Sequence, residues 1–268
     1  MSSKKLIYYY QTFTSLKPLV KANLPNLYVY LASLHFGYNN DNTPYIHLND
    51  SPPDDQPSLW QDVKNAHLNG IKILVLLGGA GGAFGDLFNN YNVFYDLLKN
   101  FLNKYNYIQG IDLDVEETVK MQDIQKLIKD IRSDFGEKFI ITLAPVVYPM
   151  ITDGPGLGGF SYKKLYQSNV GAYIDWFNVQ CYGCYNFSTY NQIINNGYPE
   201  EQIVFGMLGD EYNSSNFSRA LNEIKSVIKK YDDMGGCILW EYGDTQIDPI
   251  TWGKKINNLF NSKRGCFY

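Results

Sequence analysis

Short strand-like runs, rich in aliphatic and aromatic residues, recur along the chain and are separated by loop or helix-like segments. We find eight of them, over residues 6–10, 27–36, 71–77, 110–116, 139–143, 176–182, 203–208 and 236–241. Strands that alternate with helices pair in parallel, and eight within one domain of roughly 250 residues favour a closed barrel. The sequence therefore predicts an α/β fold, a single-domain (β/α)8 TIM barrel over residues 1–268. An open, doubly wound sheet is the alternative.

The segments between these runs contain apolar residues at helical spacing or end at helix-stopping residues. We expect helices over residues 59–69, 93–105, 121–135, 190–196, 216–231 and 249–260, with a shorter one at 162–166. A short hairpin is expected near residues 45–48, within an Asn-, Asp- and Pro-rich loop. In such a barrel the functional groups lie at the C-terminal ends of the strands.

One strand carries an unusual row of acids. Over residues 110–116, apolar residues alternate with Asp112, Asp114 and Glu116, which places three carboxyl groups on one face of the strand. Like charges held close together cannot all ionise, so at least one pKa should be raised, and a protonated carboxylic acid can donate to a leaving group. A solvated acidic edge strand or a calcium loop is the alternative, although the interior of the run lacks the glycine that calcium loops use.

Composition excludes several classes of function. A net charge of −4 argues against a nucleic-acid or anionic membrane surface, and no apolar run approaches the roughly 20 residues of a membrane span. The glycine run at residues 78–82 lacks the Lys-Ser/Thr of a phosphate-binding loop. We therefore expect no nucleotide cofactor. No apolar leader precedes the first strand, so we expect a cytoplasmic protein unless a signal peptide has been removed.

Cysteine and histidine usage gives no support for metal or nucleophile chemistry. The four cysteines are Cys181, Cys184, Cys237 and Cys266, and only three histidines are present. Cys181 and Cys184 have the spacing of a redox motif, but no second pair or nearby histidine supports zinc. We expect ordinary thiols, no metal and no Ser-His-Asp triad.

In combination, five motifs resemble glycoside hydrolase family 18, the chitinases and endo-β-N-acetylglucosaminidases. The family's Asp-x-x-Asp-x-Asp-x-Glu corresponds to Gln-Gly-Ile-Asp-Leu-Asp-Val-Glu over residues 109–116. The others follow in the family's order: Gly78-Gly79, residues 142–145, Gln180-Cys181-Tyr182 of the small plant-type members, and Trp240.

The resemblance implies substrate-assisted hydrolysis with retention of configuration. Glu116 would be the general acid, Asp114 would orient the substrate's acetamido group, Asp112 would share a proton with Asp114, and Tyr182 would hydrogen-bond the acetamido oxygen. Trp240 would form the floor under the distorted sugar. The other expected substrate contacts are Gln180, Gly78, Gly79, Tyr10, Phe36 and Met207.

Three positions depart from the family pattern. Gln109 replaces the first Asp and Leu76 replaces the Ser before the glycines, and for both we expect structural effects only. Gly183 stands where the family has Asn or Asp after Tyr182, a position that could influence substrate preference. Glu117 points away from the acidic face in the predicted strand, so we expect it at the surface.

The leading functional prediction is an endo-acting glycosidase on chitin or chito-oligosaccharides. The sequence leaves room for no inserted α+β domain between residues 208 and 216, and an open groove favours internal cleavage. The alternatives are an endo-β-N-acetylglucosaminidase on N-glycans or peptidoglycan, and a catalytically silent carbohydrate-binding protein. A carbohydrate is the expected partner, and we expect a monomer that binds neither nucleic acid nor membrane.

Overall fold

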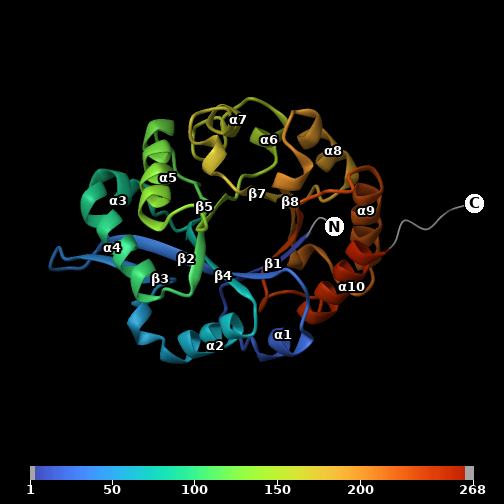
Figure 1. The fold of residues 1–268 in the computed structure, drawn as a ribbon, viewed down its shortest axis with the longest axis horizontal. Coiled ribbons are helices and arrows are strands. Elements are labelled where there is room, and N and C mark those ends of the chain that lie inside the picture. The colour runs from blue at the N-terminus through green and yellow to red at the C-terminus, as the bar shows by residue number, and fades with distance from the viewer. Residues whose placement is uncertain (1–3, 263–268) are drawn as a thin grey trace, which may run out of the picture.

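The computed structural model describes residues 4–262, so Cys266 lies outside the described residues. Within them, eight parallel strands close into a barrel because β1 pairs on one side with β2 and on the other with β9. Figure 1 shows the helices arranged around this sheet. The predicted TIM barrel is confirmed, and the open doubly wound alternative is wrong.

Nine strands make up the sheet of the described residues, and only β3 runs antiparallel to its neighbour. They are β1 (Lys5–Tyr10), β2 (Leu27–Tyr38), β3 (Pro44–Leu48), β4 (Lys72–Gly78), β5 (Ile108–Asp114), β6 (Ile140–Leu143), β7 (Trp176–Gln180), β8 (Ile203–Leu208) and β9 (Gly236–Trp240).

The α-helices are α1 (Lys17–Ala22), α2 (Pro57–Leu68), α3 (Phe84–Asn89), α4 (Tyr91–Lys104), α5 (Met121–Phe135), α6 (Tyr148–Ile151), α7 (Tyr162–Tyr166), α8 (Phe187–Asn195), α9 (Phe217–Lys230) and α10 (Pro249–Asn261). Every predicted helix is present. The predictions missed α1, α3 and α6, which span only four to six residues and are too short to display an apolar period.

The hydrophobic core has two layers, separated by the sheet. Inside the barrel, side chains of alternate strand positions pack together, among them Tyr9, Tyr30 and Leu76. The intervening positions, such as Tyr8, Leu77 and Leu113, face the surrounding helices. This alternation along each strand decides which residues can reach a cavity at the mouth of the barrel.

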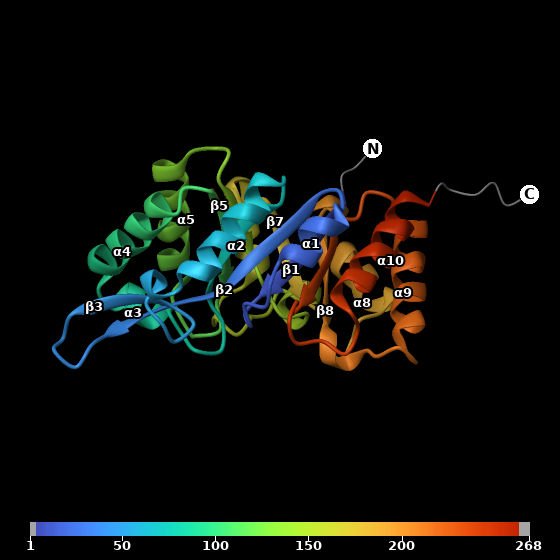
Figure 2. The same ribbon diagram turned by 90° about the horizontal axis from the view of Figure 1, so that it is seen from below.

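The sheet has one extension and no inserted domain. Strands β2 and β3 form the expected hairpin, which projects beyond the helices (Figure 2). Between β8 and β9 the chain contains only a short 3₁₀ turn and α9, as the sequence predicts. None of the helices described is long and apolar enough to cross a membrane.

Candidate active site

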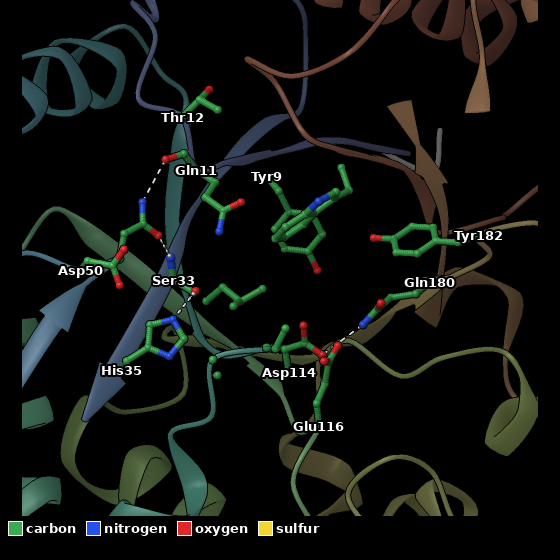
Figure 3. Close-up of a pocket in the computed structure, with 17 residues that line it drawn as sticks. Tyr9, Gln11, Thr12, Ser33, His35, Asp50, Asp114, Glu116, Gln180 and Tyr182 are labelled. Atoms are coloured by element: carbon green, nitrogen blue, oxygen red, sulfur yellow. Dashed lines mark hydrogen bonds between the residues drawn. The ribbon is translucent and has the colours of Figure 1, made fainter. Parts of the chain in front are cut away.

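A cavity of about 570 Å³ opens at the C-terminal ends of the barrel strands. Figure 3 shows Asp114 and Glu116 on one side of it, and Ser33, His35 and Asp50 on another. The side chains and glycines that line it are Tyr9, Gln11, Thr12, Ser33, His35, Asn49, Asp50, Leu76, Gly78, Gly79, Ala80, Gly81, Asp114, Glu116, Gln180, Tyr182 and Trp240.

Asp112 lies at the bottom of the acidic row and is completely buried. Its carboxylate accepts hydrogen bonds from the Tyr9 hydroxyl at 2.7 Å, the Thr142 hydroxyl at 2.6 Å and the Asn178 side-chain amide at 3.1 Å. The donors come from three different strands, so the carboxyl group is held firmly. Burial nevertheless raises the pKa of Asp112 to about 6, because the three bonds only partly replace water.

Asp114 and Glu116 lie above Asp112, where β5 ends and the cavity begins. The Gln180 amide donates a 3.0 Å hydrogen bond to Oδ1 of Asp114 and a 2.8 Å bond to the Ala144 carbonyl. In Figure 3 the Asp114 and Glu116 side chains lie next to each other below this amide. The predicted acidic face therefore exists, although β5 ends at Asp114 and Glu116 lies in the segment that follows.

The electrostatics of this row favour protonated carboxyl groups. Burial raises the pKa of Asp114 well above its usual range, and the nearby charges of Glu116 and Asp112 add to the effect. Burial also raises the pKa of Glu116, and the Gln180 amide partly opposes that shift. A carboxyl group that keeps its proton near neutral pH can act as a general acid.

The glycines that end β4 lie against Asp114. The N–H of Gly79 donates a 2.9 Å hydrogen bond to the Asp114 carbonyl. Gly78 has a φ of +97°, and a Cβ atom there would stand 2.4 Å from the same carbonyl oxygen. A Cβ atom at Gly79 would lie 3.5 Å from Oδ2 of Asp114. Larger residues at Gly78 would therefore displace the acidic end of β5.

Two acids that directly follow site residues hold the surrounding loops. Glu117 accepts backbone hydrogen bonds from Ala83, from Phe84 at 2.7 Å and from Gly85 at 3.0 Å, at the start of α3. The expectation that Glu117 is a simple surface residue is wrong, because turning away from the cavity brings it to the loop after β4. Glu241 is also buried, and it accepts bonds from the backbone N–H of Gln11 at 2.8 Å.

Aromatic side chains form the remaining wall. Trp240 ends β9 and is half-buried, with its ring centroid 5.0 Å from that of Tyr9. Tyr182 points its hydroxyl into the cavity, and this hydroxyl has no hydrogen-bond partner in the described residues (Figure 3). Burial and the neighbouring Asp114 raise the pKa of Tyr182 well above its usual value, so its hydroxyl keeps its proton.

Three predicted substrate contacts do not reach this cavity. Tyr10 faces outward and packs on Phe13, Phe36 packs on Phe94 of α4, and Met207 accepts a 3.3 Å hydrogen bond from the Trp252 indole of α10. Their placement is a correction with one cause. Each has the wrong parity along its strand, so its side chain joins the outer core layer instead of the barrel interior.

Several of the lining residues that the sequence did not predict lie next to Tyr10 or Phe36 along the chain. Tyr9, Ser33 and His35 line the cavity in place of Tyr10 and Phe36. His35 Nδ1 lies 2.7 Å from the Gly82 carbonyl, so it donates there, and Nε2 accepts from the Ser33 hydroxyl at 2.8 Å. The sequence of β1 does not separate Tyr9 from Tyr10, because aromatic residues occupy both parities of the strand. Gln11, Asn49 and Asp50 lie beyond the strands and carry no alternation signal.

Of the positions that depart from the family pattern, Leu76 lines the cavity and Gly183 does not. Leu76, expected to matter only for structure, lines the cavity and pairs in register with Asp112. Gly183 is outside the cavity lining, and a side chain there would meet open space.

No cluster among residues 4–262 could hold a metal ion, and the three cysteines described are free thiols.

Comparison with known proteins places these features in a family. The sequence model of glycosyl hydrolases family 18 matches residues 5–216. Chitinase 2 of Rhizopus oligosporus is 24% identical over 210 residues, which are 69% of this chain and 36% of that protein. The chain therefore spans about a third of the length of this curated relative.

Two solved fungal structures superpose on nearly the whole barrel. A fungal endo-β-N-acetylglucosaminidase of glycosyl hydrolase family 18 has a TM-score of 0.83 at 29% identity, covering 96% of this chain and 98% of its own. The chitinase ChiC of Aspergillus fumigatus has a TM-score of 0.80 at 28% identity, covering 94% and 98%.

Proposed function

The chain belongs to glycoside hydrolase family 18, and from that premise we propose that it cleaves β-1,4-linked N-acetylglucosamine polymers, chitin or chito-oligosaccharides, at internal bonds. As a member of this family it is a glycosidase that acts on N-acetylglucosamine-containing substrates. One observation carries the catalytic assignment that both substrate classes share. Asp114, Glu116, Gln180, Tyr182 and Trp240 come from three strand ends and line a single cavity.

In the proposed mechanism Glu116 donates its proton to the glycosidic oxygen as the bond to the anomeric carbon breaks. The substrate's own acetamido oxygen attacks that carbon and forms an oxazolinium ion. A water molecule then attacks from the face that the leaving group vacated and returns a proton to Glu116. Two inversions give net retention of configuration, with no enzyme nucleophile.

Asp114 stabilises this intermediate. Its carboxyl group lies beside Glu116 and is held by Gln180, so it can accept the acetamido N–H and balance the positive charge that develops on the ring. Its raised pKa favours a protonated Asp114 before substrate binds, and in the proposed mechanism that proton is exchanged within the acidic row. Asp112, fixed by its three donors, supplies the second carboxyl group of that exchange.

Tyr182 and Trp240 position the sugar. The neutral Tyr182 hydroxyl has no protein partner in the described chain and can donate to the acetamido oxygen, which aligns it for attack. Trp240 offers a half-exposed ring beside Tyr9 as the hydrophobic floor. Between β8 and β9 no inserted domain walls the groove among the described residues, which supports internal cleavage over threading from a chain end.

The second candidate is an endo-β-N-acetylglucosaminidase on N-glycans. The observation that favours it is the similarity to the fungal enzyme of that activity, over 96% of this chain at a TM-score of 0.83. Both reactions cleave after an N-acetylglucosamine and need the same acid and the same acetamido group, so the acidic row does not separate them.

Product analysis distinguishes the two. Chitohexaose and a high-mannose glycopeptide are each incubated with the protein, products are identified by mass spectrometry, and early anomers are recorded by NMR. We expect chitobiose and chitotriose products that appear first as β-anomers, and an intact glycopeptide. Release of a peptide carrying one N-acetylglucosamine, without chitohexaose cleavage, would transfer the assignment to the second candidate. Binding of chitohexaose without cleavage would indicate a silent lectin.

A further inference from the structure

A second cavity, of about 530 Å³, lies outside the sheet between the β1–α1 loop and α2. It shares no lining residue with the catalytic cavity, although one loop contributes to both. Gln11 and Thr12 of this loop line the catalytic cavity, whereas Phe13 and Ser15 line the second cavity. Figure 1 shows α1 and α2 side by side. Because α1 spans only Lys17–Ala22, it leaves part of α2 within residues 58–65 open to the cavity.

The lining of this second cavity includes a hydroxyl group that has no protein partner in the described residues. Tyr10 is only 1% exposed, yet its hydroxyl forms no hydrogen bond within residues 4–262 and faces the cavity. Burial raises the pKa of Tyr10, so the phenol stays neutral and can both donate and accept. Buried polar groups are normally paired, and one left open toward a cavity invites a ligand partner.

The α2 wall of the cavity combines the buried Leu59 with polar residues, most of them exposed, that offer hydrogen-bonding groups to a ligand. Four of its residues, spaced i, i+3, i+4 and i+7, form one stripe along the helix, which is separate from its buried face. They are Ser58, Gln61, Asp62 and Asn65. Asp62 also accepts a 2.6 Å hydrogen bond from the Leu16 N–H, which fixes the loop opposite.

An aromatic ring completes the site. Phe13 has a φ of +52°, a conformation that is costly for a bulky side chain, and it is half-buried. This backbone places its ring 5.3 Å from that of Tyr10, at 64°. Lys17 and Asp62 carry opposite charges, so the lining is electrically balanced.

We propose that this cavity is a second, non-catalytic saccharide site, which holds an N-acetylglucosamine-containing oligosaccharide beside the catalytic groove. An aromatic ring, paired amides and hydroxyls and no net charge match a neutral polyhydroxylated ligand. Asp62 is the only carboxyl group in the described lining, it accepts from the Leu16 N–H, and no second acid stands beside it to stabilise an oxazolinium ion, so the ligand is bound and not cleaved. The choice of sugar rests on the proposed function.

Chitotriose binding to the full chain carrying Glu116→Gln tests this, because cleavage is then suppressed. Titration followed by calorimetry and NMR should show two binding events. Trp240→Ala should remove the catalytic event. Tyr10→Phe, which retains the ring, and Asn65→Ala, at an exposed position, should each weaken the other event by about fivefold or more. Asn258→Ala, an exposed substitution on α10, is the matched control and should change neither.

The outcomes separate this proposal from the proposed function. The second site would be overturned by a single binding event that Trp240→Ala abolishes and that neither Tyr10→Phe nor Asn65→Ala weakens. The catalytic assignment would then still stand. No event at all would overturn both. In the active parent, Tyr10→Phe and Asn65→Ala should alter hydrolysis of a short fluorogenic chitotrioside by less than about twofold, because distant sites act nearly independently.

Discussion

The side-chain amide of Gln180 donates a hydrogen bond of 3.0 Å to Asp114 and thereby joins β7 to the acidic end of β5. The same nitrogen also donates to the Ala144 carbonyl at 2.8 Å, so its position is set by β6 as well. One amide therefore fixes the orientation of the carboxyl group that, in the proposed mechanism, accepts the acetamido N–H of the substrate.

Replacing Gln180 with Met should test this relationship. The side chain keeps its length but loses the donor, and we expect kcat/KM on a chitotrioside to fall by about a hundredfold. The amide lowers the pKa of both Asp114 and Glu116, so its loss raises both and should move the alkaline limb of the pH–rate profile to higher pH. Gln192→Met on the exposed side of α8 is the control, and an unshifted profile would argue against the amide's role.

Asp112 should make folding stability depend on pH in a defined direction. Its pKa is about 6 in the folded chain, above the 3.8 of a free side chain, so the folded state retains the proton to a higher pH than the unfolded state does. The stabilisation is complete below about pH 4 and is lost as the pH rises to about 6, a change of roughly 3 kcal/mol. The difference in unfolding free energy between the parent and Asp112→Asn, measured by urea titration across this range, should show that decline. A constant difference would contradict it.

Glu117 should act on substrate binding through the loop that it holds. Glu117→Ala removes the acceptor for the first N–H groups of α3, which should lower the unfolding free energy by about 1 kcal/mol and raise KM several-fold by loosening residues 78–82. Glu137→Ala removes an equally charged but exposed residue and serves as the control. Equal KM values and equal Tm values for the two variants would contradict a role for Glu117 in stabilising the start of α3 and the loop over residues 78–82.

The fold and the acidic row were predictable because both depend on local alternation. Period two places Asp112 and Asp114 on the same face, and strand-like runs of five to ten residues mark the barrel strands. Tyr10, Phe36 and Met207 face outward, and their strands carry apolar residues at both parities, so alternation alone does not distinguish the inward side chains from the outward ones. The contacts of Glu117 with α3 and of Glu241 with Gln11 join segments far apart in sequence, and no local pattern indicates such pairings.

Hydrolysis of a fluorogenic chitotrioside, by the parent and by Glu116→Gln side by side, is the most direct test of the central claim. Gln has the same shape as Glu but no proton to donate at any useful pH, so turnover should fall by at least about a thousandfold while chitotriose binding is retained. Parent-like turnover by Glu116→Gln would contradict the assignment of Glu116 as the acid. Binding without turnover by the parent itself would contradict the claim that this barrel is a chitin hydrolase.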